Sequence, residues 1–395
     1  MRLPLATLLL GLASCVATLD LQPGCDTDCV VDTDGAGVDT DPAPPDTDPP
    51  ADTDADTDPP ADTDTAPPPP TASSCFDGAF LNPPQAGPEY DQFGPVVGRH
   101  CAGTHHQAID GIERVVFLGD SVTMGTPPTQ QAKYYRNQLA AALAREFGLR
   151  APGLAWQAPD LLSTLSLKES GDFANCARFG ARTDDLQRDG NMVELCFPES
   201  KRDKRTLVVM TMGGNDIAAI TQAGLAGQAT DEIWEEVRGF VGLQEDALRW
   251  LTEDPTRFPG GLFVVFANLH EFTDGTGDTS SCTLFAISDL LGIGGFGGSW
   301  QDPTALEDMV IWANEQYLRM AVETKTDMVF MLENFCGHGW RHDDPTAPCY
   351  RGPGTPRWLD LTCIHPNATG HTALTALFMS TILDCDWPTG CTSTP

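Results

Sequence analysis

The sequence predicts an α/β domain in which helices cover both faces of a parallel sheet. Short apolar runs, such as residues 115–118 and 207–210, are typical of buried strands. Longer segments rich in helix-forming residues, such as residues 231–251, stand between these runs. Strands that alternate with helices form parallel sheets, because each crossover helix packs back onto a face of the sheet.

The expected elements follow one another from residue 115 to residue 383. We expect strands at residues 115–118, just before Gly180, and at residues 207–210, 262–266 and 328–332. We expect helices at residues 129–147, 231–251, 303–322 and 368–383. The second of these helices begins with acidic residues and the third with a proline, and both features are typical of a first helical turn.

Composition and charge exclude several classes of protein. The chain has 395 residues and a formal net charge of −33, which would repel nucleic-acid phosphates, so we expect no nucleic-acid partner. Its hydrophobic content of 41% is enough to build a core. No run of about 18 uncharged apolar residues occurs, so we expect no membrane-spanning helix.

The first residues predict export to the cell envelope. Arg2 precedes an apolar run at residues 3–12, which is too short to span a bilayer and is typical of a signal peptide. Leu12-Ala13-Ser14-Cys15 is similar to a bacterial lipobox, in which the cysteine becomes the lipidated N-terminus. We therefore expect a signal peptide at residues 1–14 and a lipid on Cys15 that anchors the protein to the outer membrane or cell surface. The alternative is an ordinary secretory peptide, with Cys15 in a disulfide.

Residues 15–74 are expected to form the anchored N-terminus and an unfolded spacer. Fifteen aspartates and no Lys or Arg lie between Asp20 and Asp64, so this segment has little with which to build a core. Residues 32–35 are similar to the start of a calcium loop, but no Glu closes one here, so we expect no ordered calcium site. The folded domain should then occupy residues 75–395.

The cysteines indicate an oxidising compartment. Thirteen occur, and setting Cys15 aside leaves an even number that can pair. A disulfide at Cys363 would fix the loop that carries His365. Short separations favour, without fixing the connectivity, the pairs Cys176–Cys196, Cys336–Cys349 and Cys385–Cys391.

Polar residues follow the ends of the expected strands, where ligand sites of parallel sheets lie. Ser121, in Gly119-Asp120-Ser121, would expose its hydroxyl beside helix N–H groups, with Asp120 ordering the turn. Asn215, in Gly213-Gly214-Asn215-Asp216, offers an amide donor beside permissive glycines. His365, in His365-Pro366-Asn367, can act as a general base. Singly, each has a structural alternative: a helix cap, a loop hydrogen bond or a packed histidine.

Together with Gly180, these blocks resemble the SGNH (GDSL) hydrolase superfamily in type and order, over about residues 112–384. The resemblance implies a flavodoxin-like three-layer α/β/α sandwich with a five-stranded parallel sheet. It also implies hydrolysis of carboxylic esters without a metal or organic cofactor. By position, Ser121 is the nucleophile and His365 the general base. The oxyanion hole comprises the N–H groups of Ser121 and Gly180 and the amide of Asn215, and we expect a Cβ at Gly180 to obstruct substrate.

One position departs from the family pattern. The family usually places an Asp three residues before the histidine, where this chain has Thr362. Either Asp360 reaches His365 across a bulged loop, or a backbone carbonyl near Thr362 orients the imidazole. We favour Asp360 as the triad acid, because a carboxylate better stabilises the imidazolium that forms.

Other polar clusters give weaker signals. His105-His106 and residues 337–342 lack an acid-and-His set at metal-binding spacing, so we expect no metal. His338 and Trp340 follow the fifth strand and either line the cleft or pack within a loop. The Gly-, Ser- and Thr-rich insert at residues 271–302 is long enough to cover the cleft.

The sequence thus predicts an exported, surface-anchored, monomeric serine esterase (EC 3.1.1.-). Its expected substrates are acylated polysaccharide, lipid or small acyl esters, and it should meet the membrane only through its lipid anchor. One alternative is a non-catalytic surface lipoprotein that keeps the fold as a binding module. Another is an acyltransferase that uses the same site.

Overall fold

A six-stranded sheet forms the centre of the folded domain, in the order β2-β3-β1-β4-β5-β6. Five strands run parallel, whereas β2 pairs antiparallel with β3 at the sheet edge. The strands are β1 (Arg114–Gly119), β2 (Lys168–Ser170), β3 (Phe173–Asn175), β4 (Thr206–Thr211), β5 (Leu262–Ala267) and β6 (Asp327–Val329). The expected five parallel strands are confirmed, but the total of five is wrong. The additional strand β2 is three polar residues long, so no apolar run marks it.

The computed structural model describes residues 69–82, 87–159, 167–188, 191–270, 272–276, 282 and 303–391. The expected signal peptide, Cys15 and nearly all of the spacer lie outside these ranges, as does most of the insert at 271–302. Within them, no helix has both the length and the apolar composition needed to cross a membrane.

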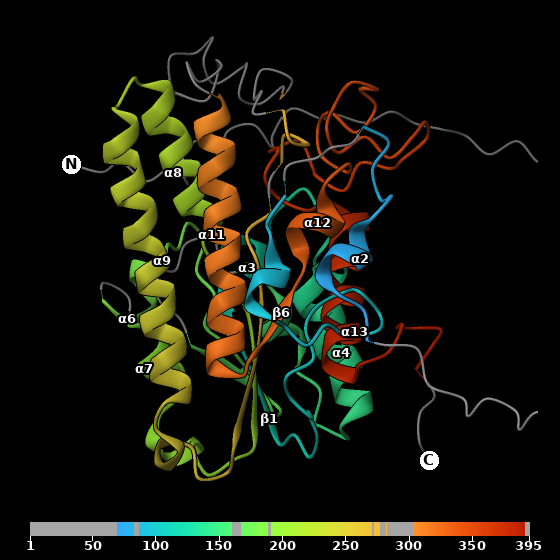
Figure 1. The fold of residues 1–395 in the computed structure, drawn as a ribbon. Helices are drawn as coiled ribbons and strands as arrows, with labels where there is room; N and C mark the ends of the chain where they lie inside the picture. Colours follow the sequence, from blue (N-terminus) through green and yellow to red (C-terminus); the bar gives the residue numbers. More distant parts are fainter. Residues whose placement is uncertain are drawn as a thin grey trace, which may run out of the picture. The chain divides into compact units, whose positions relative to one another are not determined.

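Helices cover both faces of the sheet, which confirms the three-layer sandwich (Figure 1). On one side lie α4 (Tyr135–Glu146) and α13 (Ala368–Leu383). On the other lie α8 (Gly214–Leu225), α9 (Thr230–Thr252) and α11 (Pro303–Thr324). Both faces of β1 are buried because its residues alternate between the two cores: Val116 and Leu118 face one, and Val115 and Phe117 the other.

Most expected boundaries agree with the structure, and two do not. The expected helix at 129–147 starts later, because a 3-10 turn, η2 (Gln131–Lys133), precedes α4. The expected strand at 328–332 ends at Val329, and α12 (Met331–Phe335) follows it. A short apolar run does not distinguish a strand from a buried helical turn. The remaining elements are α2 (Ala72–Phe76), η1 (Tyr90–Phe93), α3 (Ser121–Met124), α5 (Leu154–Gln157), α6 (Asp184–Gln187), α7 (Met192–Cys196), η3 (Glu199–Lys201) and η4 (Pro255–Arg257).

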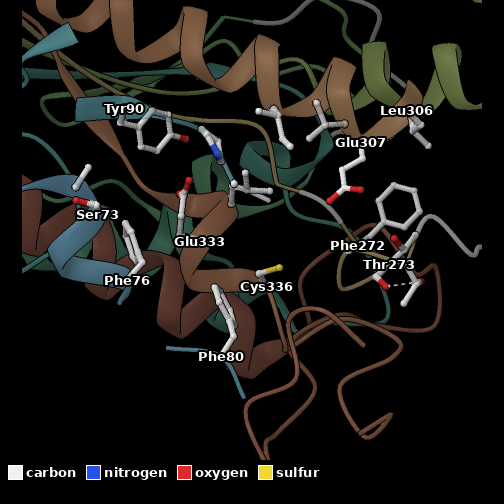
Figure 2. A pocket seen from close by; sticks show the side chains of 18 of the residues that line it. Ser73, Phe76, Phe80, Tyr90, Phe272, Thr273, Leu306, Glu307, Glu333 and Cys336 are labelled. Atoms are coloured by element: carbon white, nitrogen blue, oxygen red, sulfur yellow. Dashed lines mark hydrogen bonds between the residues drawn. The ribbon is translucent and has the colours of Figure 1, made fainter. Parts of the chain in front are cut away.

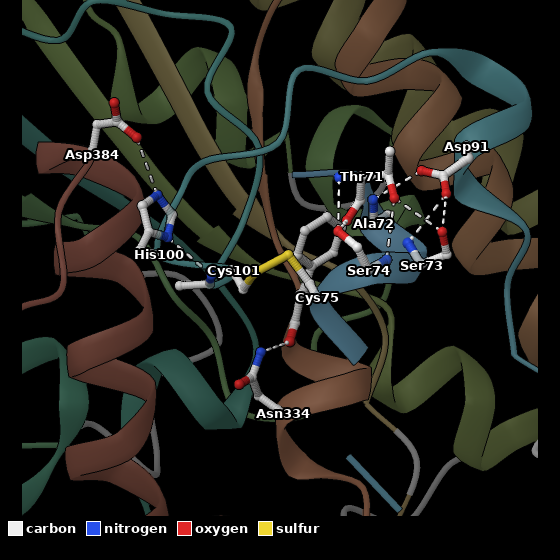
Figure 3. The surroundings of a disulfide bond; sticks show 12 residues. Thr71, Ala72, Ser73, Ser74, Cys75, Asp91, His100, Cys101, Asn334 and Asp384 are labelled. Atoms are coloured by element: carbon white, nitrogen blue, oxygen red, sulfur yellow. Dashed lines mark hydrogen bonds and ion pairs between the residues drawn. A yellow bond between two sulfur atoms is a disulfide. The ribbon is translucent and has the colours of Figure 1, made fainter. Parts of the chain in front are cut away.

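Disulfides link several of the loops. The three pairs favoured by short separation are present, and so is a disulfide at Cys363, whose partner is Cys282. A fifth pair, Cys75–Cys101, closes the N-terminal segment of the domain (Figure 3). Beside it, the carboxylate of Asp91 accepts hydrogen bonds from the N–H groups of Ala72 and Ser73, at 2.8 and 3.2 Å, and so holds the start of α2.

Candidate active site

Ser121 lies at the junction of the central strand and a short helix. β1 ends at Gly119, and Ser121 is the first residue of α3. Asp120 caps this helix, since its Oδ1 accepts a hydrogen bond from the N–H of Val122 at 2.9 Å. Burial raises the pKa of Asp120 to about 7. Asp120 therefore orders its own turn, as expected, and holds the Ser121 hydroxyl at the end of the sheet.

His365 meets Ser121 from the other end of the chain. Its Nε2 lies 2.8 Å from Ser121 Oγ, although 244 positions separate the two residues. Asn367 caps α13 just behind the histidine by accepting hydrogen bonds from the N–H groups of Thr369 and Gly370. Burial, assisted by the nearby His270, lowers the pKa of His365 to about 4. A neutral imidazole in this position can accept the serine proton.

A threonine separates the imidazole from the nearest carboxylate. Nδ1 of His365 lies 2.8 Å from Thr362 Oγ1, and Thr362 Oγ1 donates to Asp360 Oδ1 at 2.5 Å. Asp360 makes no hydrogen bond to the imidazole itself, and no backbone carbonyl faces Nδ1 in the described part of the chain. The structure shows neither a direct contact from Asp360 nor one from a backbone carbonyl, because the side chain of Thr362 lies between Asp360 and the imidazole of His365.

The turn that carries these groups is narrow and well held. The N–H of Asp360 donates to the carbonyl of His365 at 2.9 Å, so the two residues face each other across the turn. Cys363, at the tip, has a φ of 68° and is bonded to Cys282. Burial raises the pKa of Asp360 to about 6, although its hydrogen bonds from Thr362 oppose the shift. At neutral pH this carboxyl group is therefore mostly ionised.

The start of α8 holds the loop that contains Gly180. The side-chain amide of Asn215 donates to the carbonyl of Ala181 at 2.8 Å, which leaves its second amide hydrogen for another acceptor. Asp216 accepts from the N–H of Thr183 at 3.0 Å and from Nε of Arg182 at 3.1 Å. Asn215 and Asp216 thus fix the loop after β3 from one side.

Gly180 has a backbone requirement in addition to the expected one. No described atom lies within 4 Å of the position that a Cβ would take, so this position is open to a substrate, and the expected obstruction of substrate by a Cβ stays a prediction. Its φ of +74° also favours glycine. The backbone N–H groups of Gly180 and Ser121 donate to no acceptor among the described residues. The ring of the preceding Phe179 lies 6.2 Å from the imidazole of His365, so this loop borders the serine–histidine pair.

The geometry therefore places a serine hydroxyl, a neutral histidine and candidate oxyanion donors at one end of the sheet. The model of the GDSL-like lipase/acylhydrolase family matches residues 117–373, a range that includes every one of these groups. The chain belongs to this family. It is an ester hydrolase of the SGNH (GDSL) type.

Several solved structures are similar to this GDSL hydrolase. Phospholipase A1 from Streptomyces albidoflavus NA297 is 17% identical, with 68% of this chain and 99% of that chain covered and a TM-score of 0.42. The lipase Lip_vut3 from a goat rumen metagenome is 13% identical, with 68% and 97% covered and a TM-score of 0.40. A lipolytic G-D-S-L family protein from Veillonella parvula DSM 2008 is 12% identical, with 68% and 97% covered and a TM-score of 0.33. No curated protein sequence matches the chain.

Two residues of the loop that follows α12 have packing roles in this GDSL hydrolase. His338 stacks on Trp358 with ring centroids 3.7 Å apart, and its Nδ1 contacts the carbonyl of Pro356 at 2.7 Å. Trp340 lies under the guanidinium of Arg357 at 4.0 Å. These contacts favour loop packing over a place in the cleft. Within the described ranges, no group of three or more His, Cys, Asp or Glu residues is placed to hold a metal ion.

Sequence reasoning did not assign two neighbours of the GDSL hydrolase's His365. His270 follows β5, and its Nε2 contacts the carbonyl of Ile364 at 3.2 Å. Thr362 has no predicted role beyond occupying the position where the family usually has its acid. Its position three residues before the histidine was the available signal, because a hydroxyl in the acid's place can bond to the same nitrogen.

Proposed function

We propose that this GDSL hydrolase is an exported, lipid-anchored serine esterase that forms an acyl-enzyme on Ser121. The observation that carries the proposal is the 2.8 Å contact between Ser121 Oγ and His365 Nε2. A neutral histidine at this distance can remove the serine proton as the hydroxyl attacks a carbonyl carbon. The low pKa of His365, about 4, keeps this base available at neutral pH.

The reaction would proceed in two halves. Ser121 Oγ attacks the ester carbonyl and its proton moves to Nε2 of His365. The resulting oxyanion would receive hydrogen bonds from the N–H groups of Ser121 and Gly180 and from the amide of Asn215. Collapse of this intermediate breaks the ester C–O bond, and His365 protonates the departing alcohol. Water then repeats the sequence on the acyl-enzyme and releases the acid.

The proposed location follows from the N-terminal sequence. A signal peptide at residues 1–14, a lipid on Cys15 and the acidic spacer would hold the domain outside the cell. Its substrates would then be extracellular esters, such as acylated polysaccharide, lipid or small acyl esters. We propose that it acts as a monomer and contacts the membrane only through the lipid.

Hydrolysis of p-nitrophenyl esters from acetate to palmitate, compared between the full chain and Ser121→Ala, tests the enzyme. We expect activity on at least one chain length and a loss of about 10³-fold or more in the variant. Activity that survives the substitution would refute the nucleophile. No activity on any ester would instead favour the binding module. Acyl transfer to an added alcohol in preference to water would favour the acyltransferase.

A separate experiment addresses the anchor. Cells that express the wild-type chain or Cys15→Ser are supplied with labelled palmitate. Label in the wild type alone, together with release of the variant into the medium, would support the lipid at Cys15. Equal labelling of both chains would contradict it.

A further inference from the structure

We propose that Thr362 is a positioning residue that couples the Asp360 carboxylate to His365. This proposal rests on the proposed role of His365 as the base for Ser121. Four groups form a continuous chain from Ser121 Oγ through His365 and Thr362 to Asp360, with successive distances of 2.8, 2.8 and 2.5 Å. The family's usual carboxylate–imidazole contact is thereby replaced by a hydroxyl and a carboxylate in series.

The direction of each hydrogen bond follows from the chemistry of the groups. Oδ1 of Asp360 accepts from the backbone N–H of Thr362 at 2.7 Å, so Oδ1 is an acceptor toward the hydroxyl as well. Thr362 therefore donates its only O–H proton to Asp360. Its oxygen can then meet Nδ1 of His365 only as an acceptor, which requires the proton of the neutral imidazole to lie on Nδ1. Nε2 is left bare where it faces Ser121.

This arrangement stabilises the imidazolium differently from a carboxylate that contacts Nδ1 directly. The charge of Asp360 lies one hydroxyl further from the imidazole, so it stabilises the imidazolium less strongly. The depressed pKa of His365 agrees with this, since a carboxylate in direct contact would raise it. Thr362 thus selects the tautomer of the base while the base keeps a low affinity for protons.

Thr362 also supports the turn itself, because its Oγ1 accepts from the backbone N–H of His365 at 3.3 Å. The test must therefore separate this structural role from the effect on the imidazole. We compare Thr362→Val, which keeps the shape, with Thr362→Ser, which keeps the hydroxyl. We expect kcat to fall by about 10²-fold or more in the first and to stay within about fivefold of wild type in the second. A Val variant within about threefold of wild type, or a Ser variant as impaired as the Val variant, would overturn the proposal.

A double substitution and a spectroscopic readout complete the test. Thr362→Asp combined with Asp360→Asn restores the usual direct acid, so we expect it to be more active than Asp360→Asn alone and its acid pH limb to move upward. The ¹⁵N shifts of His365 at pH 7.5, assigned with His365→Gln, should report protonated Nδ1 in the wild type and a changed tautomer population in Thr362→Val. A wild-type imidazole protonated on Nε2 would refute the relay. Because the tautomer is read without turnover, this outcome is distinct from failure of the esterase proposal.

A second, independent feature is a cavity of about 650 Å³ (Figure 2). Its described lining comes from α2 and the segment that follows it, η1, α8, the loop at 272–276, α11 and α12. Ser121, Gly180, Asn215 and His365 are not among the described lining residues. The cavity is therefore a separate candidate for ligand binding.

The described wall of this cavity is aromatic and acidic. Phe76, Tyr90 and Phe272 supply rings, and Glu307 and Glu333 supply carboxylates. No Lys or Arg occurs among its described lining residues. The guanidinium of Arg351 stacks at 4.9 Å on Phe80, which lines the cavity, and donates to the carbonyls of Cys336 and Glu333.

Glu333 is the polar group that points to a ligand. Glu333 is only 8% exposed, and its Oε2 accepts a hydrogen bond from Nδ2 of Asn268 at 3.1 Å. Its Oε1 is buried and makes no hydrogen bond of ordinary geometry to a described residue; burial raises the pKa of Glu333, although the hydroxyl of Tyr90 interacts with the same carboxylate and opposes the shift. A buried carboxylate oxygen without a partner is costly, and a donor group supplied by a ligand would remove that cost.

We infer that this cavity binds an organic ammonium ion: an apolar chain that carries an N–H donor and a positive charge. The ammonium would lie beside the carboxylate of Glu333 and offset its buried charge, and the rings of Tyr90 and Phe272 can stabilise a cation near their faces. The carboxylates oppose a fatty acid or another anionic amphiphile.

Calorimetric titration of the full chain with hexylammonium, 1-hexanol and hexanoate tests this inference, because the three probes differ chiefly in their head group. We expect hexylammonium to bind at least about tenfold more tightly than either other probe, and Glu333→Gln to lose about tenfold in that affinity. Glu232→Gln, at an exposed position on α9, is the matched control. Equal or tighter binding of hexanol or hexanoate to the wild type would overturn the inference, whether or not the Glu333 variant folds. So would unchanged hexylammonium affinity in a folded Glu333→Gln.

Discussion

The imidazole of His365 is supported on its far side by the hydroxyl of Thr362, 2.8 Å from Nδ1. The carboxylate that the sequence suggests for this place lies behind that hydroxyl. The hydroxyl of Thr362 therefore connects two buried ionisable groups whose pKa values are shifted in opposite directions. The pKa of Asp360 is raised to about 6, and that of His365 is lowered to about 4. Four predictions follow from this site and its surroundings, each with its own measurement.

The acid side of the pH–rate profile should have two steps. The active form needs an ionised Asp360 and a neutral His365, so kcat/KM should fall as pH drops through about 6 and again through about 4. Asp360→Asn should have a lower plateau and lack the upper step, because the group that titrates there is gone. The measurement is kcat/KM on a neutral ester between pH 3.5 and 9. An upper step that persists in Asp360→Asn would show that another group titrates there.

Asp360 should lower the stability of the fold at high pH. Its folded-state pKa of about 6 lies above the ordinary value of 3.8, so folding favours the protonated form. The resulting stabilisation is complete below pH 3.8 and is lost as pH rises through about 6. Asp360→Asn should therefore raise the free energy of unfolding by about 2 kcal/mol at pH 8 and change it little at pH 3.5. Urea unfolding at both pH values measures this, with the exposed Asp343→Asn as control. A destabilised Asp360→Asn at pH 8 would contradict it.

Gly180→Ala should separate backbone strain from catalysis. The glycines at 180 and 227 have φ values of +74° and +83°, and neither has an atom within 4 Å of a Cβ position. Both alanine variants should lose about 1 kcal/mol of stability, because an L-residue is disfavoured at these angles. If the Gly180 N–H stabilises the oxyanion, only Gly180→Ala should also lower kcat, by about tenfold or more. The same kcat in both variants would show that neither a Cβ nor backbone strain at position 180 disturbs the active site.

Loss of the Cys282–Cys363 disulfide should impair activity more than loss of a distant one. Cys363 is at the tip of the turn that carries His365, whereas Cys385–Cys391 closes a short segment after α13. Replacement of both cysteines by serine should cost about 2–4 kcal/mol in the first pair. It should also lower kcat, because the turn gains freedom relative to Ser121. Thermal unfolding and kcat are measured for both double variants. A first-pair variant with unchanged kcat would show that the turn is held without the disulfide.

The sequence predicted the parts of this fold that are continuous apolar patterns. Strands β1, β4 and β5 are buried on both faces and read as apolar runs, and α13 begins and ends where expected. The polar edge strand β2 has no such pattern. The boundary between β6 and α12 lies inside one apolar run, so no change from apolar to polar residues marks where the strand ends and the helix begins.

The site was predicted unevenly for a similar reason. Ser121, Asn215 and His365 stand at strand or helix ends, where the expected topology itself brings them to one edge of the sheet. Spacing places Thr362 where the family usually has its acid, but the link through Thr362 also depends on side-chain directions within a six-residue turn, which spacing does not define. The backbone angle that favours glycine at position 180 could not be predicted from the sequence, which indicated only that a Cβ there would obstruct a substrate.

The turn from Asp360 to His365 contains the acid, the relay, a disulfide anchor and the base in six consecutive residues. Their mutual distances are therefore set within one short stretch of chain. A displacement of this turn as a single piece would change the contact between His365 Nε2 and Ser121 Oγ, while the distances among His365, Thr362 and Asp360 were kept. The orientation of the base is thus set within this turn, whereas its distance from the nucleophile is set by the contacts that hold the turn, among them the disulfide to Cys282.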